Sequence, residues 1–245
     1  MIHVSQLSKT YSGTTVLSIE TLELQQGEII GLVGNNGAGK TTFFSLLLDL
    51  IKPTTGFIEN QKIRVDTSEE WKSKTAAFID ENFLIGYLTA EEYFEFIAGL
   101  RGVDKVALNE FIDRFKAFFN DEILGNKKYI RDYSKGNQKK IGIAAAFIGT
   151  PSLVILDEPF ANLDPRAQMQ LQKLIKSFNS EHGVSLMVSS HDLLHVSEVS
   201  QRILILNKGE LIKDVRTNEI TLDALRAFFS EEVEDEASSS ESSEQ

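Results

Sequence analysis

The chain has 245 residues, of which 42% are hydrophobic and 25% charged, and its formal net charge is −11. This length and composition are typical of a globular protein with a sizeable core, and they offer no basic face for nucleic acid. The chain has no cysteine, which excludes disulfides, zinc–thiolate sites and thiol catalysis. The first residues lack a secretion-signal pattern, and no apolar stretch reaches the roughly 20 residues of a membrane span. We therefore expect a cytoplasmic protein that does not itself cross a membrane.

Residues 2–28 form short alternating stretches punctuated by turns, which predicts an antiparallel β segment. Later apolar runs lack alternation and therefore predict strands that are buried on both faces, as in a parallel sheet. These runs are residues 28–33, 153–157, 184–190 and 202–207. Helical patterns lie between them, and alternation of strand and helix indicates an α/β core.

A glycine-rich segment, GNNGAGKT, follows the first of these runs and precedes a helical pattern. It matches the P-loop motif G-x-x-x-x-G-K-[ST] in the required context of strand, loop and helix. Bare backbone lets successive N–H groups surround phosphate oxygens, and the helix N-terminus adds its positive dipole end. Lys40 should reach the β- and γ-phosphates, Thr41 should bind Mg²⁺, and Thr42 could contact an inner phosphate. The predicted phosphate-binding residues are Gly34, Asn35, Asn36, Gly37, Ala38, Gly39, Lys40, Thr41 and Thr42.

Residues 84–147 are rich in helix formers and aromatic residues, which predicts a helical insertion in the α/β core. Thr89 followed by Glu92 has the spacing of a capping box. The aromatic residues of this segment are expected to be mostly core. The expected fold is thus α/β: a P-loop NTPase core of mainly parallel sheet, with an N-terminal antiparallel β subdomain and an α-helical insertion subdomain.

The segment LVILDEP places two carboxylates at the end of a buried strand. Asp157 suits Mg²⁺, usually through water, and Glu158 can polarise an attacking water. Beside a P-loop this pair predicts in-line phosphoryl hydrolysis, in which positioning and charge stabilisation supply most of the rate.

Two other patterns are interpreted as ordinary structure. HDLLH spaces His191 and His195 like a zinc-protease helix, but position 192 is aspartate and no third ligand is evident. NKGE at 207–210 is similar to a guanine-reading motif, but it ends in glutamate and is a plain turn signal.

The order of these motifs resembles the nucleotide-binding subunit of ABC transporters over residues 1 to about 226. Tyr11 matches the aromatic that stacks on adenine, and Glu81 falls at the Q-loop glutamine. His191 matches the switch histidine. The longer matches are residues 34–42 for Walker A, 133–140 (YSKGNQKK) for the signature, 153–159 for Walker B with the catalytic glutamate, and 161–165 for the D-loop.

The resemblance implies ATP and Mg²⁺ as cofactors, with Lys40, Glu158 and His191 as catalytic residues. It implies Thr41, Glu81 and Asp157 at the metal. The signature residues would bind the γ-phosphate of nucleotide held by a second copy of the chain, so that two ATP molecules lie in one dimer. These signature residues are Ser134, Lys135 and Gly136.

Three positions depart from the family pattern: Glu81 replaces glutamine, Lys135 replaces the first signature glycine, and Asn137 replaces the signature glutamine. Glutamate can still accept hydrogen bonds from metal-bound water, and a lysine facing phosphate is chemically sensible. Since the catalytic positions are intact, we expect an active ATPase with an altered turnover rate.

The function implied is an ATP-hydrolysing subunit that powers transport through a separate multi-span permease, in the direction of export. It would lie at the cytoplasmic face of the cell membrane through that permease. One alternative is a soluble ABC-type ATPase acting on ribosomes or DNA, and another is an ATP sensor that does not hydrolyse. Residues 1–230 are expected to form the nucleotide-binding domain. Residues 231–245 hold seven acidic residues and no Lys or Arg, which predicts a disordered tail.

Overall fold

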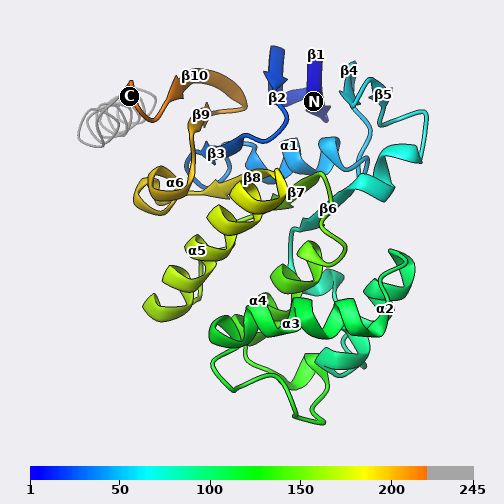
Figure 1. Cartoon of the computed structure of the whole chain (residues 1–245). Helices are drawn as coiled ribbons and strands as arrows, with labels where there is room; N and C mark the ends of the chain where they lie inside the picture. Colours follow the sequence, from blue (N-terminus) through cyan, green and yellow to red (C-terminus); the bar gives the residue numbers. More distant parts are fainter. Residues whose placement is uncertain (220–245) are drawn as a thin grey trace.

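The computed structural model describes residues 1–219, whose strands join into one ten-stranded sheet (Figure 1). The strands are β1 (Ile2–Tyr11), β2 (Thr14–Leu24), β3 (Ile29–Val33), β4 (Thr55–Asn60), β5 (Ile63–Arg64), β6 (Thr75–Phe78), β7 (Leu153–Leu156), β8 (Ser185–Ser190), β9 (Arg202–Asn207) and β10 (Glu210–Arg216). Their order across the sheet is β5-β4-β1-β2-β10-β9-β3-β8-β7-β6. Strands that are distant in the sequence, such as β3 and β8, therefore become neighbours.

The sheet has an antiparallel part and a parallel part. β1 pairs antiparallel with β2 and β4, whereas β3, β6, β7, β8 and β9 make parallel pairs. β9 and β10 form a hairpin at the NKGE turn, where Lys208 and Gly209 both have positive φ. The predicted antiparallel N-terminal segment, parallel core and turn are thus confirmed.

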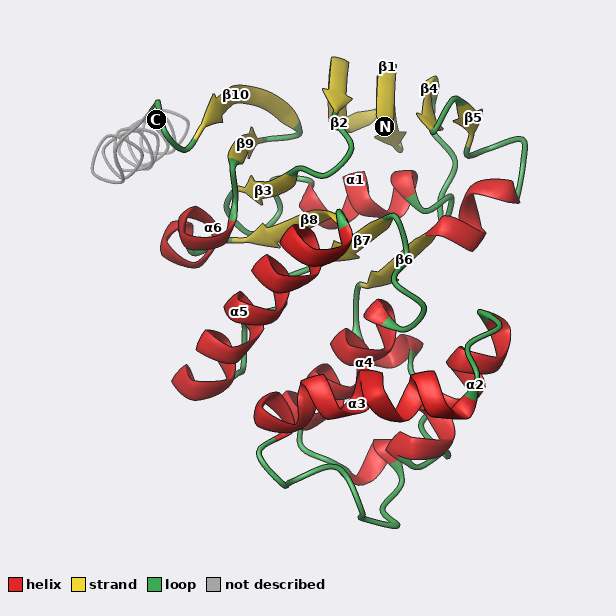
Figure 2. Ribbon diagram, in the orientation of Figure 1, coloured by secondary structure: helices red, strands yellow, loops and turns green. Residues whose placement is uncertain are grey.

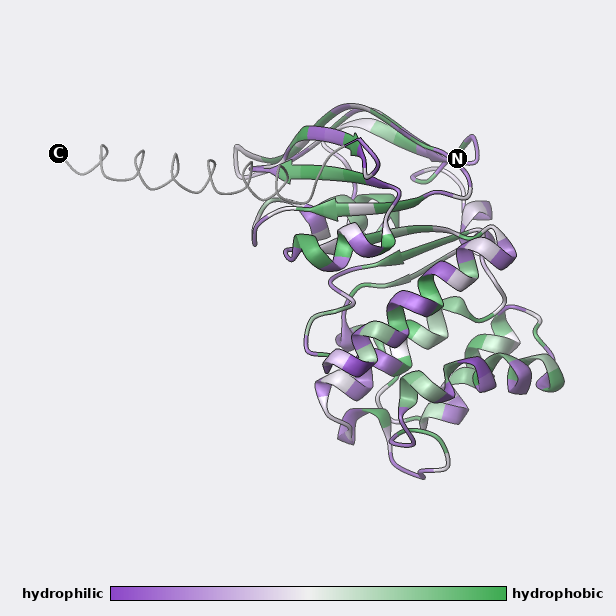
Figure 3. Ribbon diagram, turned by 60° about the vertical axis from the view of Figure 1, so that its left-hand side comes forward, coloured by the Kyte–Doolittle hydropathy of each residue, from purple (hydrophilic) through white to green (hydrophobic). Residues whose placement is uncertain are grey.

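Burial on both faces explains why the parallel strands show no alternation. In β7, Val154 and Leu156 belong to the core beneath the helices, while Leu153 and Ile155 belong to the core shared with the antiparallel strands. The exposed strand β10 alternates instead. Figure 3 shows hydrophobic residues running along the strands inside the molecule.

The helices divide between the sheet and a separate lobe. They are α1 (Lys40–Leu47), α2 (Ala90–Leu100), α3 (Lys105–Phe119), α4 (Lys135–Phe147), α5 (Pro165–His182) and α6 (Leu193–Val199), with the 3-10 turns η1 (Glu70–Lys74), η2 (Glu81–Phe83) and η3 (Ile130–Asp132). Helices α2, α3 and α4 gather in the lobe, which corresponds to the predicted helical insertion (Figure 2). The capping box is confirmed: Thr89 Oγ1 accepts from Glu92 N–H at 3.3 Å, and Glu92 Oε2 accepts from Thr89 N–H at 2.8 Å.

Aromatic packing joins the lobe to α5. The ring of Phe178 lies 4.5 Å from that of Phe147 and 5.9 Å from that of Phe115, between centroids. Most of the lobe's phenylalanines are buried, as expected, but Phe96 is 45% exposed. One α5 side chain therefore contacts both α3 and α4, which holds the lobe against the core.

Within residues 1–219, no helix combines the length and hydropathy that a membrane crossing requires. The predicted acidic tail, residues 231–245, lies outside the described residues.

Candidate active site

The P-loop connects β3 to α1 and is shaped by close contact with β9. A Cβ atom on Gly34 would lie 2.3 Å from the carbonyl oxygen of Leu206, so only glycine fits. Gly37 and Gly39 have φ of 85° and 106°, in the left-handed region that favours glycine. No side chain caps α1 and its first turn holds no acidic residue. The N-terminal N–H groups of α1 are therefore arranged to bind an anion.

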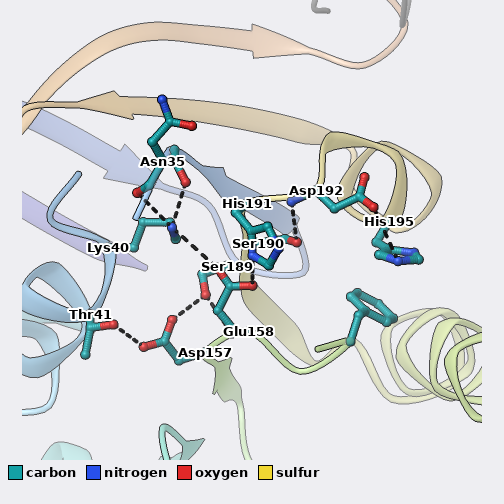
Figure 4. A network of polar contacts seen from close by, with 12 residues as sticks. Asn35, Lys40, Thr41, Asp157, Glu158, Ser189, Ser190, His191, Asp192 and His195 are labelled. Atoms are coloured by element: carbon teal, nitrogen blue, oxygen red, sulfur yellow. Dashed lines mark hydrogen bonds and ion pairs between the residues drawn. The ribbon is translucent and has the colours of Figure 1, made fainter. Parts of the chain in front are cut away.

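Lys40, the first residue of α1, places its ammonium group inside the loop. Its Nζ donates to the carbonyl oxygens of Gly34 at 2.7 Å and Asn35 at 3.2 Å. It also lies 3.3 Å from Glu158 Oε1, and the residue is only 6% exposed. A positive charge is thus held where the loop would surround phosphate groups (Figure 4).

Asp157 follows the last residue of β7 and is 5% exposed. It accepts a 2.6 Å hydrogen bond from the Thr41 hydroxyl on one oxygen and a bond from the Ser189 hydroxyl on the other. Burial raises the pKa of Asp157 above its ordinary value, and the two hydroxyl bonds only partly oppose this. A carboxylate and a hydroxyl oxygen in contact are the hard ligands that Mg²⁺ prefers.

Glu158 presents its carboxylate between Lys40 and His191. Oε2 lies 2.9 Å from His191 Nδ1, while the buried Oε1, 3.3 Å from Lys40 Nζ, has no hydrogen-bond partner within residues 1–219. The backbone of Glu158 has φ of 46°, a rare conformation for a residue other than glycine. An acceptor oriented by a histidine, with one oxygen left without a hydrogen bond, is suited to binding and polarising a water.

A pocket of about 300 Å³ brings several predicted residues together. Tyr11 of β1 and Val16 of β2 line it, with P-loop residues between Asn36 and Thr42 and with Glu158. Tyr11 is 49% exposed, which leaves its ring accessible to a planar base. The pocket thus combines an aromatic side chain, a phosphate-binding loop and a carboxylate.

The signature residues lie apart from this pocket, at the start of α4. Ser134 caps that helix, with its Oγ accepting from Asn137 N–H at 3.3 Å. A Cβ atom on Gly136 would lie 2.8 Å from the carbonyl oxygen of Asn162, so the signature packs closely against the D-loop of its own chain. Ser134, Lys135 and Gly136 do not line the pocket that the P-loop lines.

Glu81, on η2, has its carboxylate 3.7 Å from Lys139 Nζ. The two histidines of HDLLH contact different residues. His191 contacts Glu158, whereas the ring of His195 stacks on that of Phe160 at 5.1 Å between centroids.

Sequence reasoning missed two residues that contact the site, Ser189 and Lys139. The Ser189 hydroxyl accepts from Glu158 N–H at 2.8 Å, and Lys139 Nζ donates to the Glu158 carbonyl oxygen at 2.8 Å. A hydroxyl two residues before the predicted switch histidine was the available signal for Ser189. Lys139 lay within the signature segment but had no recognised role.

Comparison with known proteins places this geometry in context. The protein family described as ABC transporter matches residues 17–161. The bacitracin transport ATP-binding protein BcrA of Enterococcus faecalis is 32% identical over 229 residues, covering 90% of this chain and 70% of that protein. The lantibiotic transport ATP-binding protein SrtF of Streptococcus pyogenes is 30% identical, covering 86% of this chain and 89% of that protein.

Solved structures show the same fold. A structure described as the ATP binding subunit of an ABC transporter has a TM-score of 0.78 and 28% identity, covering 94% of this chain and 93% of that chain. A dimeric post-hydrolysis state of the ATP-binding cassette MJ0796, bound to ADP and Pi, also has a TM-score of 0.78. It is 23% identical and covers 89% of this chain and 99% of that chain.

Proposed function

The chain belongs to the ABC transporter family as an ATP-binding subunit that hydrolyses ATP to drive transport, and from this premise we propose how its residues divide the work. Two copies would bind two ATP molecules between them and drive export through a separate multi-span permease. The observation that carries the hydrolytic part is the Glu158 carboxylate, held between Lys40 and His191 beside the Asp157–Thr41 pair.

In this proposal each pocket residue acts on a defined part of ATP. Tyr11 stacks on adenine, and the P-loop N–H groups with Lys40 bind the phosphates. Glu158 polarises the attacking water, while His191 fixes the position of the Glu158 carboxylate relative to the γ-phosphate.

Thr41 and Asp157 would hold Mg²⁺, which neutralises charge on the β- and γ-phosphates when bound. The Thr41 hydroxyl and an Asp157 carboxylate oxygen are already in contact, at 2.6 Å. Burial raises the pKa of Asp157, and a nearby cation would lower it again. Glu81, the third predicted ligand, would join them only if its carboxylate left Lys139.

The separation of the signature from the pocket supports a two-copy mechanism. Ser134, Lys135 and Gly136 lie at the N-terminus of a 13-residue helix, a suitable anion site, yet they do not line the pocket proposed for the nucleotide of their own chain. ATP would then contact Lys40 of one copy and Ser134 of the other only when the dimer is closed. Such differential binding is what shifts a conformational equilibrium.

An apolar groove supports a permease partner. It has a volume of about 650 Å³ and lies between the core and the helical lobe. Phe83 and Leu100 line it and are 65% and 70% exposed, and Tyr87 nearby is 70% exposed. Exposed apolar residues gathered in a groove mark an interaction site, and the proposed occupant is a cytoplasmic helix of the permease. The chain would then sit at the cytoplasmic face of the membrane. Export is proposed as the direction because the YSKG signature resembles that of exporter-type subunits.

The test is Glu158→Gln, with the surface substitution Glu181→Gln as a matched control. Removing the general base should lower ATP hydrolysis by about 10²- to 10⁴-fold. Nucleotide binding should persist, so size-exclusion chromatography with light scattering should detect an ATP-bound dimer at millimolar ATP and Mg²⁺. The Glu181 variant should keep wild-type hydrolysis. Retained hydrolysis in Glu158→Gln would remove its assignment as base, and only monomers would refute the two-copy arrangement.

The same variant tests the partner. Tagged Glu158→Gln protein, purified from detergent-solubilised membranes with ATP and Mg²⁺, should bring down a multi-span membrane protein in near-equal amount. Ribosomal or DNA-bound partners, with none from the membrane, would overturn the transport role while leaving the ATPase chemistry intact.

A further inference from the structure

A buried lysine contacts the backbone of the proposed base. Lys139 lies in the second turn of α4, with its side chain 7% exposed. Its Nζ donates to the Glu158 carbonyl oxygen at 2.8 Å and lies 3.7 Å from Glu81 Oε1. A buried ammonium group is costly unless it is paired, and these two contacts are the ones that compensate the buried charge of Lys139.

The contact matters because Glu158 adopts a left-handed backbone conformation, with φ of 46°. Such a conformation persists only when the surroundings hold it. The Glu158 N–H donates to Ser189 Oγ at 2.8 Å, and its carbonyl oxygen accepts from Lys139 and, at 3.3 Å, from Ala161 N–H. Side chains from β8 and α4 thus hold the backbone N–H and the carbonyl oxygen of Glu158. These contacts set the direction of its carboxylate.

The second partner of Lys139 lies next to residues that line the apolar groove. Glu81 begins η2, and Phe83, two residues later, is exposed and lines the groove. Helix α4 is pressed against this region, because a Cβ atom on Gly142 would lie 2.3 Å from the Phe78 ring and 3.1 Å from the Leu84 side chain. Glu81 and Lys139 therefore lie on two elements that pack directly against each other.

We propose that Glu81 and Lys139 form a positioning pair that holds the Glu158 backbone and thereby sets the direction of the proposed catalytic carboxylate. The proposal rests on the proposed function of Glu158 as the base. Lys139 does not line the pocket that holds Tyr11 and the P-loop, and its hydrogen bond goes to the Glu158 backbone, so it acts through Glu158. The pair also gives a reason for an acid at position 81: a carboxylate balances the buried ammonium group, whereas a neutral glutamine would not.

A double-mutant cycle on the purified full chain tests the pair through steady-state ATP hydrolysis. Lys139→Met should lower kcat about tenfold or more and change KM for ATP by less than about twofold, because misaiming the base affects chemistry rather than binding. Glu81→Gln should also lower kcat, as Lys139→Met does. The double variant should be no slower than Lys139→Met alone, since the two residues act as one unit. Lys139→Arg, which keeps the charge, should restore most of the activity.

Arg202→Met is the matched control for the loss of a largely buried cation. Arg202 also donates to a backbone carbonyl, that of Glu23 at 2.9 Å, and also pairs with carboxylates, but it lies at the opposite end of β9 from the site. Arg202→Met should lower Tm and leave kcat unchanged.

Three results would overturn the pair. One is an unchanged kcat in Lys139→Met while Glu158→Gln is inactive, and another is additive losses in the double variant. A third is a shift in the Mg²⁺ concentration needed by Glu81→Gln alone, which would assign Glu81 to the metal. If Lys139→Met does not fold, the kcat values of Lys139→Arg and Glu81→Gln still test the pair. Lys139→Arg should keep most of the activity and Glu81→Gln should lose activity. Active Glu158→Gln would instead refute the proposed function, so the two failures are distinguishable.

Discussion

Asp157→Asn should stabilise the nucleotide-free protein while removing its response to Mg²⁺ and ATP. Asp157 is 5% exposed, and burial outweighs its hydroxyl bonds in setting its pKa, which is raised from 3.8. The folded state therefore binds the proton more tightly than the unfolded state, and the free energy of unfolding falls as pH rises between the two pKa values. At neutral pH the ionised carboxylate is destabilising. Asparagine has the same shape without the charge, and the hydroxyls of Thr41 and Ser189 can rotate to accept from its amide.

The size of the effect follows from the linkage between proton binding and stability. Each unit by which folding raises the pKa corresponds to about 1.4 kcal/mol of stability that Asp157→Asn recovers at neutral pH. For a domain of this length each kcal/mol recovered raises Tm by about 2–4 °C. A ligand at 100 times its Kd stabilises a protein by about 2.7 kcal/mol, or roughly 5–10 °C here. The wild type should gain that increment with Mg²⁺ and ATP, and Asp157→Asn should gain much less.

Thermal melts of both proteins, with and without ATP and Mg²⁺, measure these differences, and surface Asp113→Asn serves as the control. The order of Tm should reverse between the two conditions. Without nucleotide, the advantage of Asp157→Asn should shrink as pH is lowered towards 3.8, where the carboxyl becomes protonated. A nucleotide-free variant that is less stable than wild type at neutral pH would show that the hydroxyl bonds outweigh burial, which would refute the reasoning.

Two further substitutions test the P-loop and the attachment of the lobe. Gly34→Ala should lower ATP affinity about tenfold or more because its Cβ would lie 2.3 Å from the Leu206 carbonyl oxygen. Gly99→Ala, in open space on α2, should leave affinity unchanged in the same fluorescent-nucleotide titration. Phe178→Ala should lower the free energy of unfolding by about 3–5 kcal/mol, since the ring is 1% exposed and completes an aromatic cluster. Urea titration measures this, with exposed Met169→Ala as the control, and a loss below about 1 kcal/mol would contradict the packing argument.

Local patterns were sufficient for the elements and for the parts of the site that are contiguous in sequence. The P-loop can be predicted because strand, glycine turn, lysine and helix follow one another within residues 28–50. The paired carboxylates Asp157 and Glu158 are adjacent and end a buried strand, and Thr89 and Glu92 lie within one helical turn. Each of these needs only short-range geometry, which the spacing of residue types specifies.

The sequence by itself therefore determined the class of fold, the P-loop and the identity of the two carboxylates. Only the tertiary structure decided what surrounds Glu158. His191, Ser189 and Lys139 are 33, 31 and 19 residues away from it, and they reach it because β8 lies beside β7 and α4 packs across β6. No local pattern contains these pairings, since they depend on the order of strands in the sheet and on close packing at Gly142. The direction of the Glu158 side chain is set by such long-range contacts, which exist only once the strands have assembled.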